Sequence, residues 1–325
     1  MALHYRARVV DAHADTLLQV VRGRRHLGEL SSEGHVDLPR LLAGGVDLQV
    51  FAVWVDPSHR GGEALLQVVR ALTTFRRELV AEPRLQLVRS RSDLERVGQT
   101  PGRVCALLAL EGAEALCGGT GAELDVLETL YVLGVRAAGL TWNGRNALAD
   151  GVEEGDSGGG LTRAGRAVVR AMNRLGMIVD IAHLAPAGVR DVLELSAGPV
   201  IASHANCRAL CDHPRNLTDA QILALAARGG VLGISFVPEF LRDSPPGAVH
   251  LEDVVAHIDH AVQLAGPEHV GLGSDFDGTA QTPVELPDVR FLPRLTEALL
   301  RRGYPEPAVE AILGGNFLRV FQQIL

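Results

Sequence analysis

A histidine and an aspartate separated by one residue, His13 and Asp15, end the first apolar run of the chain, residues 9–15. In a β-strand, side chains two residues apart point to the same face, so an imidazole nitrogen and a carboxylate oxygen would be directed at one point. Nitrogen and oxygen ligands at ~2.0–2.2 Å are typical of a bound divalent metal. A His-x-Asp pair alone is a weak signal, but four later apolar runs also end in residues of metal-binding type.

These four residues are Glu111, His183, His204 and Asp275, each at the end of its own predicted strand. A single histidine in such a position is more often a hydrogen-bonded residue of the core or rim. Six unpaired polar groups brought to one place would be costly to desolvate, however, and a metal centre removes that cost. We therefore interpret the whole set as metal ligands.

The ligand set comes together only if the strand ends meet, and the pattern of the chain predicts that they do. Strand-like runs alternate with helical patterns, which is typical of βα units around a parallel sheet. The predicted strands are residues 9–15, 46–55, 104–111, 135–142, 177–183, 200–204, 231–236 and 270–275. Helices are predicted between them, for example at 62–80 and at 219–227, where Thr218 looks like an N-cap.

Eight strands with intervening helices predict an α/β protein with a (β/α)8 TIM-like barrel, and further C-terminal helices are predicted at about 289–301 and 305–313. No internal repeat, linker or composition break divides the chain, so we expect a single domain over residues 1–325. In such barrels the functional site lies at the C-terminal ends of the strands. Asp180, inside the predicted strand 177–183, is a candidate for orienting one of the ligands.

Composition limits the class of function. The formal net charge of −8 and the pI near 5.8 argue against a nucleic-acid partner. No signal peptide, long apolar span or lipid-anchor signal is present, so we expect a cytoplasmic protein without a membrane partner. The chain contains no lysine, which excludes a Schiff-base lysine, a P-loop lysine and a carbamylated lysine bridging two metals.

Six ligands are too many for one tetrahedral zinc ion and suit two ions about 3.5–4 Å apart. Because no lysine can bridge them, a carboxylate must, and Glu111 lies between the two ligand groups in chain order. Two metals would share a water molecule and generate a bridging hydroxide as the nucleophile. Asp275 could accept its proton and pass it to the leaving group.

Ordered motifs along the whole chain resemble the renal, or membrane, dipeptidase family of zinc peptidases. They include DAHADTL at 11–17, ALEG at 109–112, LTWNGRNALADG at 140–151, SHANCRAL at 203–210, HPRNLTD at 213–219 and GLGSDFDG at 271–278. The resemblance implies a binuclear zinc dipeptidase, other divalent metals being possible substitutes, that cleaves dipeptides and accepts some with a C-terminal D-residue. It also implies a homodimer.

The resemblance assigns a role to each candidate residue. His13, Asp15 and Asp275 would hold one zinc, His183 and His204 the other, and Glu111 would bridge them. Arg215 matches the family arginine that contacts the substrate carboxylate, and a bidentate Arg–carboxylate pair suits that role.

Two positions depart from the family pattern. Trp142 stands where the best-known members carry a histidine that binds the scissile carbonyl, and an indole can donate only one hydrogen bond and carries no positive charge. Stabilisation of the oxyanion would then rest on the zinc, on Asn143 or on Arg145. Val237 stands where some members have a tyrosine.

The departure at Trp142 keeps a second hypothesis open, a metal-dependent amidase, lactamase or deacylase acting on an amide that is not a dipeptide. A third is a non-catalytic barrel that only binds a ligand. The complete ligand set argues against the third hypothesis, because a scaffold has no need of six converging polar groups.

Overall fold

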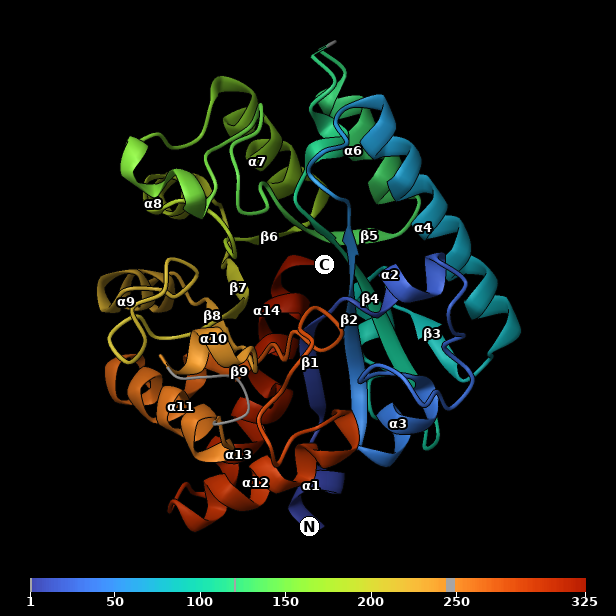
Figure 1. The fold of residues 1–325 in the computed structure, drawn as a ribbon, viewed down its shortest axis with the longest axis vertical. Helices are drawn as coiled ribbons and strands as arrows, with labels where there is room; N and C mark the ends of the chain where they lie inside the picture. Colours follow the sequence, from blue (N-terminus) through green and yellow to red (C-terminus); the bar gives the residue numbers. More distant parts are fainter. Residues whose placement is uncertain (1, 120, 244–248) are drawn as a thin grey trace.

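The computed structural model describes residues 2–119, 121–243 and 249–325, and its centre is a closed barrel of parallel strands (Figure 1). Around the barrel the strands follow the order β1, β2, β4, β5, β6, β7, β8 and β9, and β9 pairs with β1 to close the ring. The strands are β1 (Val9–Ala14), β2 (Val46–Trp54), β4 (Val104–Glu111), β5 (Val135–Gly139), β6 (Ile178–Asp180), β7 (Ile201–Ala205), β8 (Val231–Ile234) and β9 (Val270–Leu272). The predicted (β/α)8 barrel is confirmed.

A further strand, β3 (Leu85–Leu87), was not predicted. It is three residues long and pairs with the first half of β4, on the side where β5 takes over farther along. A run of three residues is too short to show the two-residue periodicity on which the prediction of strands depends.

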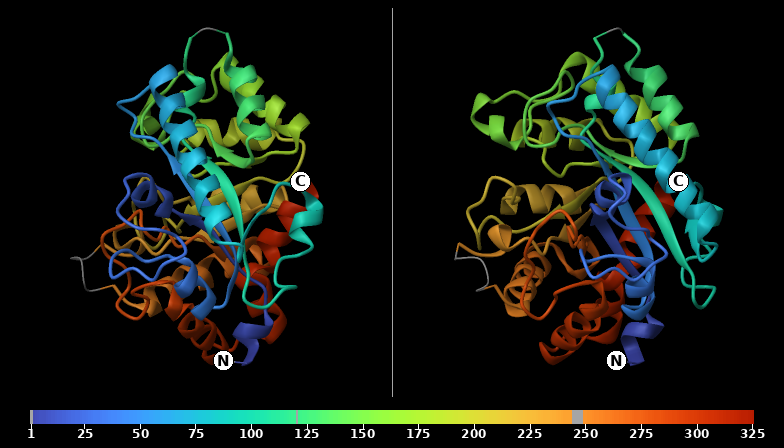
Figure 2. Two further views of the ribbon diagram at one scale, coloured as in Figure 1. Left: turned by 90° about the vertical axis from the view of Figure 1, so that its right-hand side faces the viewer. Right: turned by 45° about the vertical axis from the view of Figure 1, so that its right-hand side comes forward.

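Helices cover the outside of the barrel, as the two rotated views make clear (Figure 2). The long helices are α4 (Gly62–Ala81), α6 (Glu123–Val132), α7 (Arg163–Leu175), α8 (Pro186–Leu195), α9 (Asp219–Ala227), α11 (Leu251–Ala265) and α12 (Leu292–Arg301). The shorter ones are α1 (Ala2–Arg6), α2 (Thr16–Val21), α3 (Leu38–Ala43), α5 (Arg91–Leu94), α10 (Pro238–Leu241) and α13 (Glu306–Glu310). Thr218 is the predicted N-cap of α9 and forms a reciprocal capping box with Gln221.

The C-terminal helix α14 (Asn316–Ile324) lies across the ring of strands rather than in the outer layer (Figure 1). Its apolar side chains, among them Phe317 and Phe321, belong to the same buried cluster as Val10, Leu48 and Leu107 from the strands. This packing closes the barrel at the end away from the candidate site. The opposite end, where the strands finish, is therefore the end open to a ligand.

Gly273, directly after β9, lets two strands approach closely at the level of the candidate site. A Cβ atom built on Gly273 would lie 1.7 Å from the backbone oxygen of Ser203 in β7, so the backbone would have to move. We expect Gly273→Ala to destabilise the fold by about 3 kcal/mol, the scale of overpacking a rigid core, measured by urea unfolding. Gly198→Ala is the control, since its Cβ would meet only Ile324 at 4.0 Å; equal stability of the two variants would contradict this account.

Candidate metal centre

The structure brings all six predicted ligands to the open end of the barrel, but only some of them lie on strands. His13 and His204 lie within β1 and β7, and Glu111 is the last residue of β4. His183 and Asp275 lie three residues beyond β6 and β9, in left-handed backbone with φ of 66° and 61°. The prediction that these two end their strands is wrong, because left-handed backbone cannot continue a ladder.

Asp15 also lies outside its predicted strand. It precedes α2, and its own φ of −88° and ψ of 19° begin the turn into that helix. The backbone is still extended up to this point, since Ala14 bridges Phe276 and the Asp15 amide donates to the Phe276 backbone oxygen at 2.9 Å. The side chains of His13 and Asp15 converge as the alternation of a strand predicts, with Asp15 Oδ2 lying 3.5 Å from His13 Nε2.

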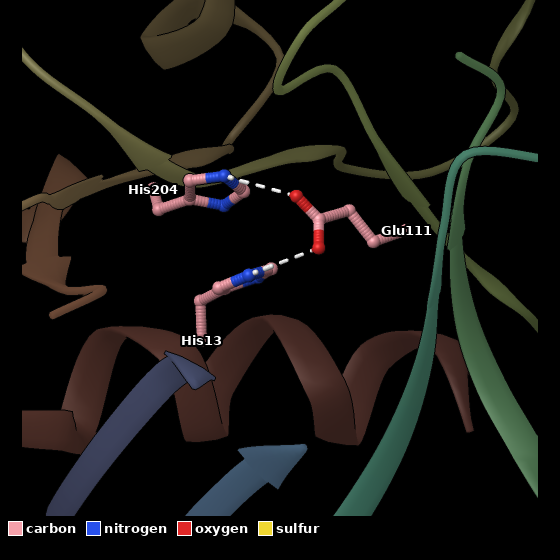
Figure 3. A group of neighbouring side chains, drawn as sticks. All are labelled: His13, Glu111 and His204. Carbon is pink, nitrogen blue, oxygen red and sulfur yellow. Dashed lines mark ion pairs between the residues drawn. The ribbon is translucent and has the colours of Figure 1, made fainter. Parts of the chain in front are cut away.

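The carboxylate of Glu111 lies between imidazoles from different strands, one oxygen toward each side (Figure 3). Oε2 is 3.5 Å from His13 Nε2, whereas Oε1 is 2.9 Å from His183 Nε2 and 3.7 Å from His204 Nε2. Glu111 is therefore the carboxylate that could contact cations held by either group of imidazoles.

A second group of ligand atoms lies next to the first and shares one residue with it. His13, Asp15 and Asp275 each offer an atom within 4.8 Å of the other two, and His13, Glu111 and His204 do the same. All of these side chains are buried or nearly so. Each of the two overlapping groups has the residue types and the spacing to hold a divalent ion.

The hydrogen bonding of these residues fits a bound cation. His13 Nε2 and Glu111 Oε2 are buried and find no hydrogen-bond partner among the described residues. His183 Nε2 and His204 Nε2 lie only 2.9 Å apart. Unpaired buried polar atoms of this kind are rare and call for a ligand. A divalent metal would satisfy them together.

The protonation states of His183 and His204 also fit a bound cation. Burial, followed by the positive charges of Arg215 and His13, holds the pKa of His183 and of His204 well below the ordinary value, so both imidazoles are neutral and have a free lone pair. Burial and the neighbouring Asp15 raise the pKa of Glu111 to about 8. A carboxylate that is this costly to ionise alone gains most from a bound cation.

Asn143 fixes the orientation of one ligand. Its Oδ1 accepts a hydrogen bond of 2.7 Å from His183 Nδ1, which leaves His183 Nε2 as the nitrogen without a proton. Sequence reasoning placed Asn143 among the substrate-binding residues, and its side chain also lines the cavity above the site. The contact with His183 adds an orienting role that residue type and spacing did not indicate.

We expect Asn143→Leu to lower the affinity for zinc by about 10–100-fold, the usual cost of removing a group that orients a metal-binding histidine. Asn143→Asp keeps an acceptor for His183 and should retain most of the affinity. Zinc binding is measured by competition with a chromophoric chelator. An unchanged zinc affinity in Asn143→Leu combined with a raised KM would instead support the substrate-binding role alone.

Arg215 reaches the site from the loop that follows β7 and is buried, with 4% of its surface exposed. Its Nη2 donates to His183 Nε2 and to the backbone oxygen of His204, each at 3.1 Å. Its Nε has no hydrogen-bond partner among the described residues. A buried guanidinium with a free N–H beside the ligand set can receive a carboxylate.

Two further aspartates form hydrogen bonds around the site and not with the side chains of the ligands. Asp180 Oδ1 accepts from the amides of Ala182 and Ser203 at 3.0 and 2.9 Å, next to His183 and His204. Asp277, two residues after Asp275, accepts from Thr16 Oγ1 and from the amide of His35, each at 2.6 Å, and pairs with Arg25. Asp277 was missed by sequence reasoning, although its place in the DFDG segment, 275–278, was a usable signal.

Above the ligands lies a cavity of about 640 Å³, lined by ligands and by Arg215, Trp54, Trp142 and Asn143. Arg145, the other candidate for stabilising an oxyanion, is turned away and paired with Asp150. A parallel barrel with a cavity above converging histidines and carboxylates defines the class of the protein: an enzyme-like barrel with a candidate metal site at the C-terminal ends of its strands.

Comparison with known proteins then gives the family. The whole chain, residues 1–325, matches the family model described as membrane dipeptidase, peptidase family M19. A dipeptidase of Aspergillus oryzae, aclJ, is 36% identical over 300 residues, covering 90% of this chain and 70% of that protein. The chain belongs to peptidase family M19, and it is a metallo-dipeptidase by class.

Solved structures agree. A metallopeptidase from Rhodobacter sphaeroides, in complex with a phosphinate mimic of the dipeptide L-Ala-D-Ala, superimposes with a TM-score of 0.89 at 30% identity, covering 98% of this chain and 99% of that one. A family M19 metallopeptidase, dipeptidase AC, superimposes with a TM-score of 0.88 at 31% identity, and the match covers 98% of both chains. Among the residues that the structure describes, we find no helix with the length and hydrophobicity of a membrane span.

Proposed function

We propose that this chain hydrolyses free dipeptides, including those with a D-residue at the C-terminal position, with two zinc ions as cofactor. The single observation that carries the proposal is the placement of Glu111 between the two sets of imidazoles, with the buried Arg215 beside them. The dipeptide mimic bound to the Rhodobacter sphaeroides relative supports the class of substrate and its stereochemistry.

The ligands divide between the two ions. His13, Asp15 and Asp275 would hold one, His183 and His204 the other, and Glu111 both. When bound, the ions supply a Lewis acid for the scissile carbonyl and lower the pKa of a water molecule. Asp275 accepts the proton of the attacking water and delivers it to the leaving amine. Trp142 and Asn143 line the cavity on the side of His183 and limit where the substrate can lie.

Arg215 would bind the C-terminal carboxylate of the dipeptide, which explains a restriction to short substrates. We expect Arg215→Met to lower kcat/KM for Ala-Ala by about 100-fold or more, the cost of breaking a buried charge pair. Hydrolysis of Ala-Ala amide, which lacks the carboxylate, should already be slow in the wild-type enzyme and should change little. Arg215→Lys keeps the charge without the bidentate geometry, so its kcat/KM for Ala-Ala should lie between those of the wild type and Arg215→Met.

The same experiment separates the proposal from its alternative. If Arg215→Met lowers kcat/KM equally for Ala-Ala and for Ala-Ala amide, Arg215 does not bind the substrate carboxylate. Cleavage of a lactam or an N-acyl amino acid by the zinc-loaded enzyme, without cleavage of any dipeptide, would favour the amidase, lactamase or deacylase hypothesis that Trp142 motivates. The homodimer and the cytoplasmic location stay predictions.

A further inference from the structure

Both tryptophans of the chain, Trp54 and Trp142, lie together at the wall of the cavity. Trp54 is the last residue of β2 and Trp142 lies three residues beyond β5, so the two are far apart in sequence. Their ring centroids are 5.7 Å apart with the ring planes at 70°, the edge-to-face geometry favoured by aromatic pairs. Leu18, from α2, also lines this cavity and shares a second, smaller cavity with Trp54.

The corner of the cavity formed by Trp54, Trp142 and Leu18 presents mainly hydrocarbon. The indole nitrogen of Trp54 is buried and has no partner in the described part of the chain, so what Trp54 presents to the cavity is ring carbon. Both tryptophans are only partly buried, which leaves aromatic surface available to a ligand. A large apolar side chain placed here would exchange contact with water for contact with two aromatic rings.

The order of the strands tells which end of a dipeptide reaches the corner. Around the closed ring, β2 and β7 are separated by three strands on either side, so Trp54 lies across the open end of the barrel from the loop that carries Arg215. The ligand set lies between them. A dipeptide whose carboxylate is held by Arg215, and whose peptide bond lies over the ligands, therefore extends its N-terminal residue toward Trp54.

We propose that Trp54 and Trp142, with Leu18, form the subsite for the side chain of the N-terminal residue, and that this subsite selects dipeptides with an aromatic or large aliphatic residue at that position. The inference rests on the proposed function and deepens it by naming the class of substrate. Behind Trp54 a smaller cavity of about 170 Å³ shares Leu18 and Trp54 with the main one, so Trp54 also forms the partition that limits the depth of the subsite.

The first test compares two series of substrates on the zinc-loaded full chain. We expect kcat/KM for Phe-Ala to exceed that for Ala-Ala by at least about tenfold, the scale of filling an apolar pocket. Trp142→Ala should remove most of this ratio, whereas Trp142→Phe, which keeps an aromatic ring, should retain it. The ratio of kcat/KM for Ala-Phe to kcat/KM for Ala-Ala should be the same in the wild type, Trp142→Ala and Trp142→Phe. The zinc content of each protein is measured as well, to exclude an effect through His183.

The second test is independent of turnover. Because the chain has no tryptophan other than these two, its tryptophan fluorescence reports on this corner alone. A phosphinate mimic of Phe-Ala should shift or quench the emission more strongly than a mimic of Ala-Phe. In Trp142→Phe the remaining signal comes from Trp54 and should still respond.

The outcomes separate this inference from the proposed function. If no dipeptide is cleaved by the zinc-loaded wild type, the proposed function fails, and the fluorescence comparison still decides whether the corner binds the side chain. If dipeptides are cleaved but Phe-Ala is no better than Ala-Ala, the subsite is refuted and the dipeptidase stands. The subsite is also refuted if Trp142→Ala lowers kcat/KM for Phe-Ala, Ala-Phe and Ala-Ala by the same factor.

Discussion

Glu111→Gln should abolish both tight metal binding and hydrolysis. The carboxylate lies 2.9 Å from His183 Nε2 and 3.5 Å from His13 Nε2, so it is the residue that joins the two halves of the site. Removing one partner from a buried charged set costs about 3–5 kcal/mol, which corresponds to a factor of about 10²–10⁴ in affinity or rate. The measurements are zinc per chain after dialysis and kcat/KM for a dipeptide.

Glu114→Gln is the matched control for this prediction. Glu114 is also buried, three residues later, but its Oε1 accepts a hydrogen bond from Asn146 Nδ2 at 3.1 Å and it offers no atom to either ligand group. It should keep the zinc content of the wild type. A Glu111→Gln protein that retains two zinc ions per chain and is active would show that Glu111 does not bridge.

Gly278→Ala should inactivate the enzyme without unfolding it. A Cβ atom on Gly278 would lie 2.3 Å from Asp275 Oδ1 and 2.4 Å from Asp15 Oδ2. Both contacts are with the ends of side chains, so the fold can yield by rotating them, but both carboxylates belong to the predicted ligand set. We expect loss of at least one zinc and a fall in kcat/KM of about 100-fold or more, since a displacement of about 1 Å can cost that much.

The thermal unfolding midpoint of metal-free Gly278→Ala should stay within a few degrees of that of the metal-free wild type, which separates a damaged site from a damaged fold. Gly62→Ala serves as control, because its Cβ would meet nothing within 4 Å. An active, fully loaded Gly278→Ala enzyme would mean that Asp15 and Asp275 do not bind the metal from these positions.

The barrel was predictable because its strands and helices carry strong local signals. The run 104–111 is continuously apolar before Glu111 and forms β4 over the same residues, buried throughout. Asp219–Ala227 forms the predicted helix because Thr218 caps it and Gln221 completes the capping box. The ligand types were predictable for a related reason, since each follows such a run and the barrel brings the ends together.

The parts that sequence reasoning missed depend on the backbone after the strands have ended. His183 and Asp275 reach the site from left-handed positions, which are uncommon for residues other than glycine and which no local sequence pattern marks here. The contacts of Asn143 with His183 and of Asp277 with Arg25 join segments 40 and 252 residues apart in the chain. Neither periodicity nor residue type encodes such long-range pairs.

The central claim, a binuclear metal site that cleaves dipeptides, is tested most directly by one combined measurement. Zinc per chain is determined together with the hydrolysis of L,L and L,D dipeptides, before and after chelation and after zinc is restored. We predict about two zinc ions per chain and cleavage that is lost with the chelator and recovered with zinc. A protein that binds no metal after reconstitution, or that cleaves dipeptides equally well without it, would contradict this account.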